Sequence, residues 1–279
     1  MAVSPALSAV AALLACPICG AAMTVGASVV CANRHSFDIA RQGYVSFLVG
    51  TSPHAGDTGE MVAARADFLA AGYYEPIAAA VSDATGAAGG LVVDIAAGTG
   101  YYLARVLEDH PGLVGIALDV STAAARRAVR AHDRAAAATA DAWRRLPVGD
   151  GVAAAAITVF GPRNGAELAR ILAPGGRAVI VTPTRNHMRE LRERFGLIDI
   201  QDDKDARLDA QLDQLQLVSR DILEYRIEIG PADVLNEIFM GPSAFHLDRD
   251  TVLQQLDARP ATVTVSITVS VFTRREALL

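Results

Sequence analysis

Three cysteines and one histidine near the start of the chain have the spacing of a metal site. They form the pattern Cys-x2-Cys-x11-Cys-x3-His, with ligands Cys16, Cys19, Cys31 and His35. Two close pairs separated by about ten residues can close a tetrahedron of thiolate and imidazole ligands around Zn²⁺. Four protein ligands leave no position for water. We therefore predict a structural zinc ion that holds a small β module with a recognition surface.

The same stretch has a second interpretation, because Leu13-Leu14-Ala15-Cys16 resembles the cleavage box of an exported lipoprotein. An export signal begins with positive charge, but the first fifteen residues contain no Lys or Arg. Lipidation would also remove Cys16 from the ligand set. Buried free thiols are the third possibility. We favour the zinc site and predict a cytoplasmic protein.

A second group of candidate residues follows an apolar segment at residues 91–95. Asp94 lies in this segment, and Gly98 and Gly100 follow it where a backbone can approach a ligand closely. Asp119 ends the next apolar segment, where an acid can accept hydrogen bonds from a ribose diol. Asp141 lies in a weaker third segment, either to meet an adenine amino group or as a solvated acid. The three acids predict a nucleotide-containing cofactor.

The glycine pattern distinguishes two kinds of cofactor. A dinucleotide fingerprint needs Gly-x-Gly-x-x-Gly, and the third glycine is missing here. The pattern Asp94-x-Ala96-x-Gly98-x-Gly100 instead resembles the first motif of class I methyltransferases. The resemblance implies an S-adenosyl-L-methionine site made by Asp94, Ala96, Gly98, Thr99, Gly100, Tyr101, Tyr102, Asp119 and Asp141.

The elements that must position these residues alternate between strands and helices. Apolar runs at 91–95, 114–120, about 138–147, 154–160 and 175–184 predict parallel strands with right-handed crossovers. Runs at 215–229 and 260–275 supply a sixth and a seventh strand. We therefore predict an α/β fold, a class I (Rossmann-like) methyltransferase with a seven-stranded, mostly parallel sheet. A helix and loop starting at Pro231 are expected to overhang the site.

The chain divides into three predicted parts. Residues 1–50 form the zinc-binding RNA-recognition module, residues 51–76 a linker helix, and residues 77–279 the methyltransferase domain. In the linker, Asp57 is expected to cap a helix. Its apolar face is expected to contain Met61, Ala64, Phe68 and Leu69.

Composition limits the partners. The net charge of −6 argues against a general basic coat for nucleic acid, although a local patch is compatible with it. No run of 18 apolar residues is present, so we expect no membrane partner.

The motifs together resemble a known family. Besides the zinc set and the strand-end acids, the matching segments are Gly43-Tyr44-Val45, Gly56-Asp57-x2-Glu60-Met61, Ala64-Arg65-x2-Phe68-Leu69-x2-Gly72-x-Tyr74-x-Pro76, Leu118-Asp119-Val120-Ser121 and Glu167-Leu168-Ala169-Arg170. In this combination the chain resembles the bacterial 23S rRNA (guanine-N1)-methyltransferases, a family that includes macrolide-resistance enzymes. The resemblance covers nearly the whole chain. Ala96 and Ala97 depart from it, standing where Gly and Cys are frequent.

This resemblance implies methyl transfer from S-adenosyl-L-methionine to N1 of a guanine in a 23S rRNA hairpin, by a protein similar to known homodimers. Arg65 and Tyr74 are expected to line the cleft. Residues after the fourth strand normally face the target base, which nominates Arg163 to stabilise O6 and Asn164 to fix the base edge.

Several roles stay open. Tyr44, Phe37 and Arg34 suit base stacking and phosphate contact on the zinc module, and His187 and His246 are candidate bases. The alternatives for the whole chain are a class I methyltransferase for a small molecule, with the zinc module as a structural cap, and a regulatory binding protein without activity.

Overall fold

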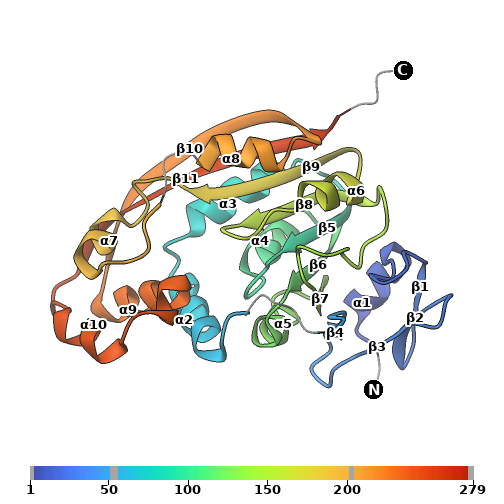
Figure 1. The fold of residues 1–279 in the computed structure, drawn as a ribbon, viewed down its shortest axis with the longest axis horizontal. Coiled ribbons are helices and arrows are strands. Elements are labelled where there is room, and N and C mark those ends of the chain that lie inside the picture. The colour runs from blue at the N-terminus through green and yellow to red at the C-terminus, as the bar shows by residue number, and fades with distance from the viewer. Residues whose placement is uncertain (1–2, 51–55, 201–203, 276–279) are drawn as a thin grey trace.

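The computed structural model describes residues 3–50, 56–200 and 204–275 and contains two sheets (Figure 1). The first residues of the predicted linker, 51–55, lie outside the described residues. So do the outermost residues of the two terminal parts.

The small sheet belongs to the N-terminal module. It has the order β1-β2-β3, all antiparallel, from β1 (Met23–Val25), β2 (Ser28–Cys31) and β3 (Ser36–Asp38). Helix α1 (Pro5–Val10) and the 3₁₀ turn η1 (Ala11–Leu13) precede it. The side chains of Phe37 and Phe47 pack edge to face, with ring centroids 5.0 Å apart, and form the centre of this small module.

The large sheet has the order β10-β11-β9-β8-β5-β6-β7-β4. Its main strands are β5 (Gly90–Ile95), β6 (Leu113–Asp119), β7 (Ala135–Thr139), β8 (Ala153–Val159), β9 (Leu172–Pro183), β10 (Leu215–Ile229) and β11 (Ala261–Arg274). Strands β5 to β9 are parallel, and β11 runs antiparallel to both neighbours. The strand order reverses between β5 and β8, where α/β sheets bind ligands.

Two expectations about this sheet were wrong. The third strand is β7, which ends before Asp141, and the expected position around 138–147 was too late because an all-alanine strand has a weak pattern. The described residues form eight strands in this sheet, not seven. The additional strand, β4 (Val45–Ser46), comes from the N-terminal module and pairs parallel with β7 through Val45 and Ala138.

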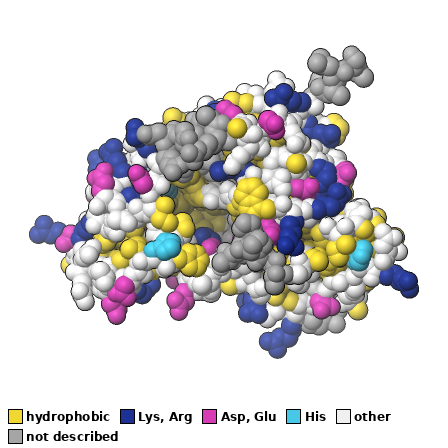
Figure 2. Space-filling model, in the orientation of Figure 1, with side chains coloured by type: hydrophobic (Ala, Val, Ile, Leu, Met, Phe, Trp, Pro, Cys, Tyr) yellow, Lys and Arg dark blue, Asp and Glu magenta, His cyan; other side chains and the backbone are white. Residues whose placement is uncertain are grey.

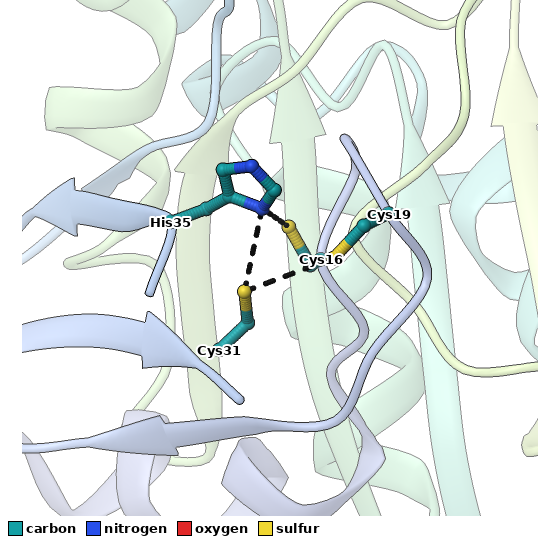
Figure 3. A group of neighbouring side chains, drawn as sticks. All are labelled: Cys16, Cys19, Cys31 and His35. Atoms are coloured by element: carbon teal, nitrogen blue, oxygen red, sulfur yellow. Dashed lines mark hydrogen bonds between the residues drawn. The ribbon is translucent and has the colours of Figure 1, made fainter. Parts of the chain in front are cut away.

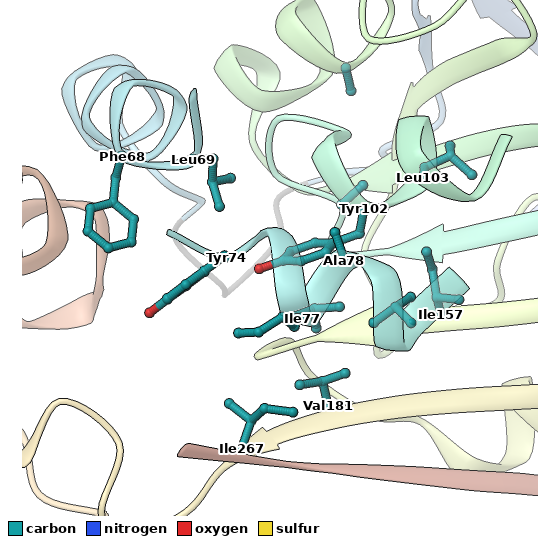
Figure 4. Packing of buried hydrophobic residues seen from close by; sticks show 14 of the residues in the cluster. Phe68, Leu69, Tyr74, Ile77, Ala78, Tyr102, Leu103, Ile157, Val181 and Ile267 are labelled. Carbon is teal, nitrogen blue, oxygen red and sulfur yellow. The ribbon is translucent and has the colours of Figure 1, made fainter. Parts of the chain in front are cut away.

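Helices cover both faces of the sheet. One face carries α3 (Glu75–Thr85), α4 (Tyr101–Asp109) and α5 (Thr122–Ala128), and the other carries α1, α6 (Gly165–Ile171) and α8 (Lys204–Gln211). Neighbouring residues in a strand belong to different cores, as Val92 and Val93 do. Figure 4 shows part of the first core, where Tyr74, Ile77 and Tyr102 pack over Ile157 and Val181.

A third group of helices lies at the end of the sheet far from the zinc module (Figure 1). It contains α2 (Gly59–Ala70), α7 (Arg189–Phe195), α9 (Pro231–Met240), the turn η2 (Pro242–Phe245) and α10 (Arg249–Gln255). Helix α9 packs on α2, so the helix predicted to start at Pro231 is confirmed. Among the described residues, no helix has both the length and the apolar character needed to cross a bilayer.

The linker helix is only partly as predicted. Thr58, not Asp57, caps α2, because its hydroxyl accepts a 3.2 Å hydrogen bond from the backbone N–H of Met61. The Asp57 side chain turns instead toward Arg65. The expected apolar face is confirmed by the burial of Met61, Ala64, Phe68 and Leu69.

Candidate functional site

The four predicted metal ligands converge in the N-terminal module (Figure 3). One ligand atom from each of Cys16, Cys19, Cys31 and His35 lies within 4.8 Å of all the others. The Nδ1 atom of His35 is 3.5 Å from the sulfur of Cys16 and 3.4 Å from that of Cys31, and the sulfurs of Cys19 and Cys31 are 3.8 Å apart. Tetrahedral zinc requires separations of about 3.8 Å between sulfurs and about 3.5 Å between sulfur and nitrogen. The donor set therefore fits Zn²⁺.

The loop around Cys19 favours the thiolate that a metal needs. The backbone N–H of Ala21 and the side-chain amide of Asn33, whose nitrogen lies 3.3 Å from the sulfur, lower the pKa of Cys19 to about 6. Burial raises the pKa of Cys16, which a bound cation would oppose by taking the thiolate as ligand.

The surface of the module differs from the expectation. Phe37 and Tyr44 are buried, with 6% and 7% of their surface exposed, so neither ring can stack on an RNA base. Phe37 belongs to the core that includes the zinc module, whereas Tyr44 belongs to the core on the other face of the large sheet, with residues of α3, α4 and α5. Arg34 is exposed and remains available for a phosphate.

A cavity of about 720 Å³ opens at the carboxyl ends of β5, β6, β7 and β8. Figure 2 shows the hollow, bordered by hydrophobic side chains. The residues predicted from the sequence that line it are Arg65, Tyr74, Asp94, Ala96, Gly98, Thr99, Tyr101, Tyr102, Asp119, Asp141 and Arg163.

Two predicted site residues do not line the cavity. Gly100 has φ +78°, and a Cβ there would lie 2.9 Å from that of Ala131, so the glycine permits helix packing behind the cavity. Asn164 caps α6, accepting from the backbone N–H of Glu167 and donating to the carbonyl of Ala142. Its amide is committed to these bonds, so the structure does not bring it to a target base.

Asp119 organises the floor of the cavity. Its two carboxylate oxygens each accept a 2.8 Å hydrogen bond, one from the backbone N–H of Gly98 and one from that of Ser121. Burial raises the pKa of Asp119 despite these bonds. The acid therefore fixes the glycine turn, and its remaining lone pairs face the cavity.

Asp94 is more deeply buried than Asp119 and has fewer hydrogen-bond partners. Its side chain is buried, and Oδ2 has no hydrogen-bond partner among the described residues. Burial, and then the charge of Asp119, raise the pKa of Asp94 well above its ordinary value, although the backbone N–H of Leu103 opposes this. A buried acid with an unused oxygen is suited to a ligand that brings positive charge or hydrogen-bond donors.

Arg65 connects three walls of the cavity. Its guanidinium pairs with Asp57 and donates a 2.5 Å hydrogen bond to the carbonyl of Met240 at the end of α9. The carbonyl of Asp57 accepts a 2.6 Å bond from the hydroxyl of Ser121. Arg65 also covers Gly98, where a Cβ would lie 3.2 Å from it. The linker and α9 are thus held over the Gly98 turn.

At the far wall, Tyr74 is buried and its hydroxyl lies 3.1 Å from Nε2 of His187. The backbone N–H of Ser266 donates to Nδ1 of the same imidazole, so Nε2 carries the hydrogen and donates to Tyr74. With both nitrogens used in this way, His187 is not placed as a base. His246 is exposed and does not line the cavity.

The sequence reasoning did not identify several lining residues, including Phe160, Glu237 and Asp57. Phe160 follows the fourth strand and has φ +57°, a strained conformation for a large side chain. Glu237 has a sequence signal that could have found it, since it is an acid within the apolar stripe of Val234 and Ile238.

Comparison with known proteins gives relatives for the whole chain. The model of the N-terminal zinc ribbon of RlmA matches residues 14–49. A 23S rRNA (guanine(748)-N(1))-methyltransferase of Streptomyces fradiae is 41% identical, over 92% of this chain and 95% of its own length. A proposed 23S rRNA (guanine-N(1)-)-methyltransferase of Micromonospora griseorubida is 43% identical, over 91% of this chain and 95% of its own.

Solved structures share the architecture at low identity. A chain from the complex of the Haloferax volcanii Trm112 methyltransferase activator with a proposed methyltransferase superposes with a TM-score of 0.51. It is 20% identical and covers 80% of this chain and all of its own. The YcgJ protein of Bacillus subtilis gives 0.50 at 15% identity, over 74% of this chain and all of its own. The fold is that of a class I methyltransferase with an added zinc module, as predicted.

Proposed function

The chain belongs to the family of 23S rRNA (guanine-N1)-methyltransferases, and from this we propose that it methylates N1 of a guanine in a 23S rRNA hairpin. The observation that carries the proposal is that one chain joins the zinc ribbon to a cavity containing both Asp94 and Asp119. The relatives match nearly their full length, so both parts are shared with them. With a small-molecule substrate the zinc ribbon would serve only as a structural cap, whereas the relatives that share both parts are 23S rRNA methyltransferases.

S-Adenosyl-L-methionine would supply an electrophilic methyl group on a sulfonium centre. We propose that Asp119 accepts from its ribose hydroxyls, because this acid stands at the end of the second parallel strand with lone pairs toward the cavity. The unpartnered Oδ2 of Asp94 suits the amino-acid end, and Asp141 suits the adenine. Arg65 and Tyr74 close the opposite side.

The target guanine would enter from the end of β8. Arg163 lines the cavity there, its Nε has no partner among the described residues, and burial lowers its pKa. A guanidinium in such a place can stabilise negative charge that develops on O6 when N1 loses its proton. Phe160, with 39% of its surface exposed, offers a ring for stacking.

Recognition of the hairpin is proposed for residues 1–50, with residues 51–76 as linker and 77–279 as the methyltransferase domain. Arg144 and Arg145 line a smaller cavity of about 230 Å³ between the zinc module and the main cavity, beside Pro17 and Ile18. Helix α5, labelled near β4 in Figure 1, carries the exposed Arg126 and Arg127. Arg144 and Arg145 pair with Asp141 and Asp150, so the arginines of α5 supply most of the local positive charge that an acidic chain needs for RNA.

The proposal also covers the oligomeric state of the protein and its location in the cell. We propose a homodimer, supported by the apolar surface of the edge strand β10, where Val218 and Ile222 are 57% and 71% exposed. Ile222→Lys should then halve the mass measured by light scattering. A ribosomal substrate supports a cytoplasmic location.

The proposal is tested by incubating the protein with labelled S-adenosyl-L-methionine and unmodified 23S rRNA. Methylation at N1 blocks base pairing, so reverse transcription should stop at one guanine. Asp119→Ala, which removes the ribose acceptor, should give no stop. Label transfer without a stop would move the modification to another atom, and no transfer to free or assembling rRNA would refute the proposed substrate.

A further inference from the structure

The proposed reaction requires a group that removes the N1 proton of guanine, and the histidines do not supply it. N1 of the neutral base carries a hydrogen, and its lone pair is delocalised into the ring. Methylation therefore proceeds once that proton is transferred to an acceptor. His187 uses both nitrogens in hydrogen bonds, and Arg163 has no acceptor.

Glu237 is the remaining acid with the required position. It projects from α9 into the cavity wall that also contains Tyr74, His187 and Arg192. Its carboxylate makes no hydrogen bond or ion pair among the described residues, and Oε2 is shielded from solvent without a partner. Glu237 and Asp94 are the two cavity acids with such an unused oxygen.

The wall connects Glu237 to the residues proposed to face the base. Burial raises the pKa of Tyr74 well above its ordinary value, and the negative charge of Glu237 raises it further. The ring centroid of Tyr74 lies 6.1 Å from that of Phe160, which lies 5.3 Å from that of His187. Arg163 in the loop after β8 and Glu237 on α9 line the same cavity as Phe160, so a base stacked on Phe160 would share that cavity with both side chains.

We propose that Glu237 is a catalytic residue that accepts the N1 proton of the target guanine, an inference that rests on the proposed function. The carboxylate takes the proton, and the electron pair of the N1–H bond stays on the ring, with O6 facing Arg163. N1 then bonds to the methyl carbon as the carbon–sulfur bond breaks. The products are N1-methylguanine, S-adenosylhomocysteine and a neutral Glu237, which returns its proton to water.

The surroundings of Glu237 suit a base at neutral pH. Burial raises its pKa to about 7, opposed by the positive charge of Arg192 from α7. The other charged or titratable groups that line this part of the cavity are Tyr74 at the start of α3, His187 before α7, Arg65 of α2, and Asp199 after α7, which pairs with Arg192. A base is most effective when its pKa is close to the working pH.

The test compares Glu237→Gln with Asp233→Asn. Asp233 lies one turn earlier on the same helix and accepts from the hydroxyl of Tyr73 outside the cavity. Single-turnover methylation of 23S rRNA is followed by the reverse-transcription stop between about pH 6 and pH 9, and cofactor affinity is measured by calorimetry. Glu237→Asp, which keeps a shorter acid, is the conservative variant.

We expect Glu237→Gln to lower the rate by about 100-fold or more, with cofactor affinity changed less than about threefold. The wild-type rate should rise with pH and level off above about 7, the pKa of Glu237. The variant should lack this break and keep rising as N1 itself ionises. Asp233→Asn should match the wild type, and Glu237→Asp should keep the break at a lower rate.

Other outcomes would overturn the inference in distinguishable ways. A Glu237→Gln rate within about threefold of wild type means that the proton goes elsewhere, because general-base catalysis contributes about 100-fold or more. A parallel loss of cofactor affinity means that Glu237 binds the cofactor. If the wild-type protein gives no stop, the proposed function fails, and the inference fails with it.

Discussion

We predict that Asp94 destabilises the ligand-free protein and that its value lies in binding the ligand. The side chain is buried, its Oδ2 has no partner among the described residues, and Asp119 adds a second negative charge nearby. An unpaired buried polar group costs about 1–3 kcal/mol, and a charged one costs more. We expect Asp94→Asn, which keeps the shape and removes the charge, to raise the free energy of unfolding by about 1–3 kcal/mol.

The increase in the free energy of unfolding that Asp94→Asn causes should become larger as pH rises. The pKa of Asp94 is raised in the folded protein, so the wild type is most stable where this acid is neutral and loses stability as pH rises through the raised pKa. Asparagine does not titrate. The stability difference between Asp94→Asn and wild type should therefore be smallest near the ordinary aspartate pKa of about 3.9 and should grow as pH rises toward the raised pKa of Asp94.

The assay is thermal unfolding with and without S-adenosyl-L-methionine. In a domain of this size each kcal/mol moves the melting temperature by about 2–4 °C, so the ligand-free variant should melt a few degrees higher. The added cofactor should stabilise the wild type but not the variant, whose affinity should fall about 100-fold, or about 2.7 kcal/mol. A variant that melts lower at every pH, or binds the cofactor normally, would refute the reasoning.

Three shorter predictions concern the rest of the site. Phe160→Gly should relieve the strain at φ +57° and leave the melting temperature unchanged or higher. Methylation should nevertheless fall about tenfold in the reverse-transcription assay, because stacking on one base is worth about 1–3 kcal/mol; unchanged methylation would exclude stacking. Arg65→Gln should weaken cofactor binding about tenfold in calorimetry, since each charge-assisted bond it loses, to Asp57 and to the Met240 carbonyl, is worth about 1.5–3 kcal/mol. Binding unchanged within twofold would show that this link is dispensable. Cys31→Ser should release zinc, measured by atomic absorption, and lower the melting temperature by several degrees; a variant retaining one zinc per chain would contradict the ligand assignment.

The residues that could be predicted from sequence are those whose role depends on local order. Asp94 and Asp119 end neighbouring parallel strands, so the sheet brings them together whatever the loops do. The four metal ligands are similarly fixed by spacing within twenty residues. Glu237, Phe160 and Asp57 reach the cavity only because α9, β8 and α2 meet there, and no local pattern encodes that meeting.

Other candidate residues have local structural roles that their motifs did not reveal. Gly100 matched a cofactor motif, yet its missing side chain serves the contact with Ala131. Asn164 follows the fourth strand, where residues that face the target base are expected. An Asn before a helix is also a preferred N-cap, and in the structure Asn164 caps α6. Phe37 and Tyr44 suit base stacking by residue type, and packing was the open alternative for Phe37; both rings are buried, Phe37 in the core that includes the zinc module and Tyr44 in the core beside α3, α4 and α5.

The short strand β4 links zinc binding to the protection of the large sheet against aggregation. Val45 and Ser46 occupy the outer side of β7, whose five buried residues would otherwise form an open edge of uncharged backbone. An exposed edge of this kind pairs with other chains. A newly made chain without zinc would not order β4, and the edge of β7 would then be exposed to pairing with other chains. Loss of zinc should therefore make the protein prone to aggregation.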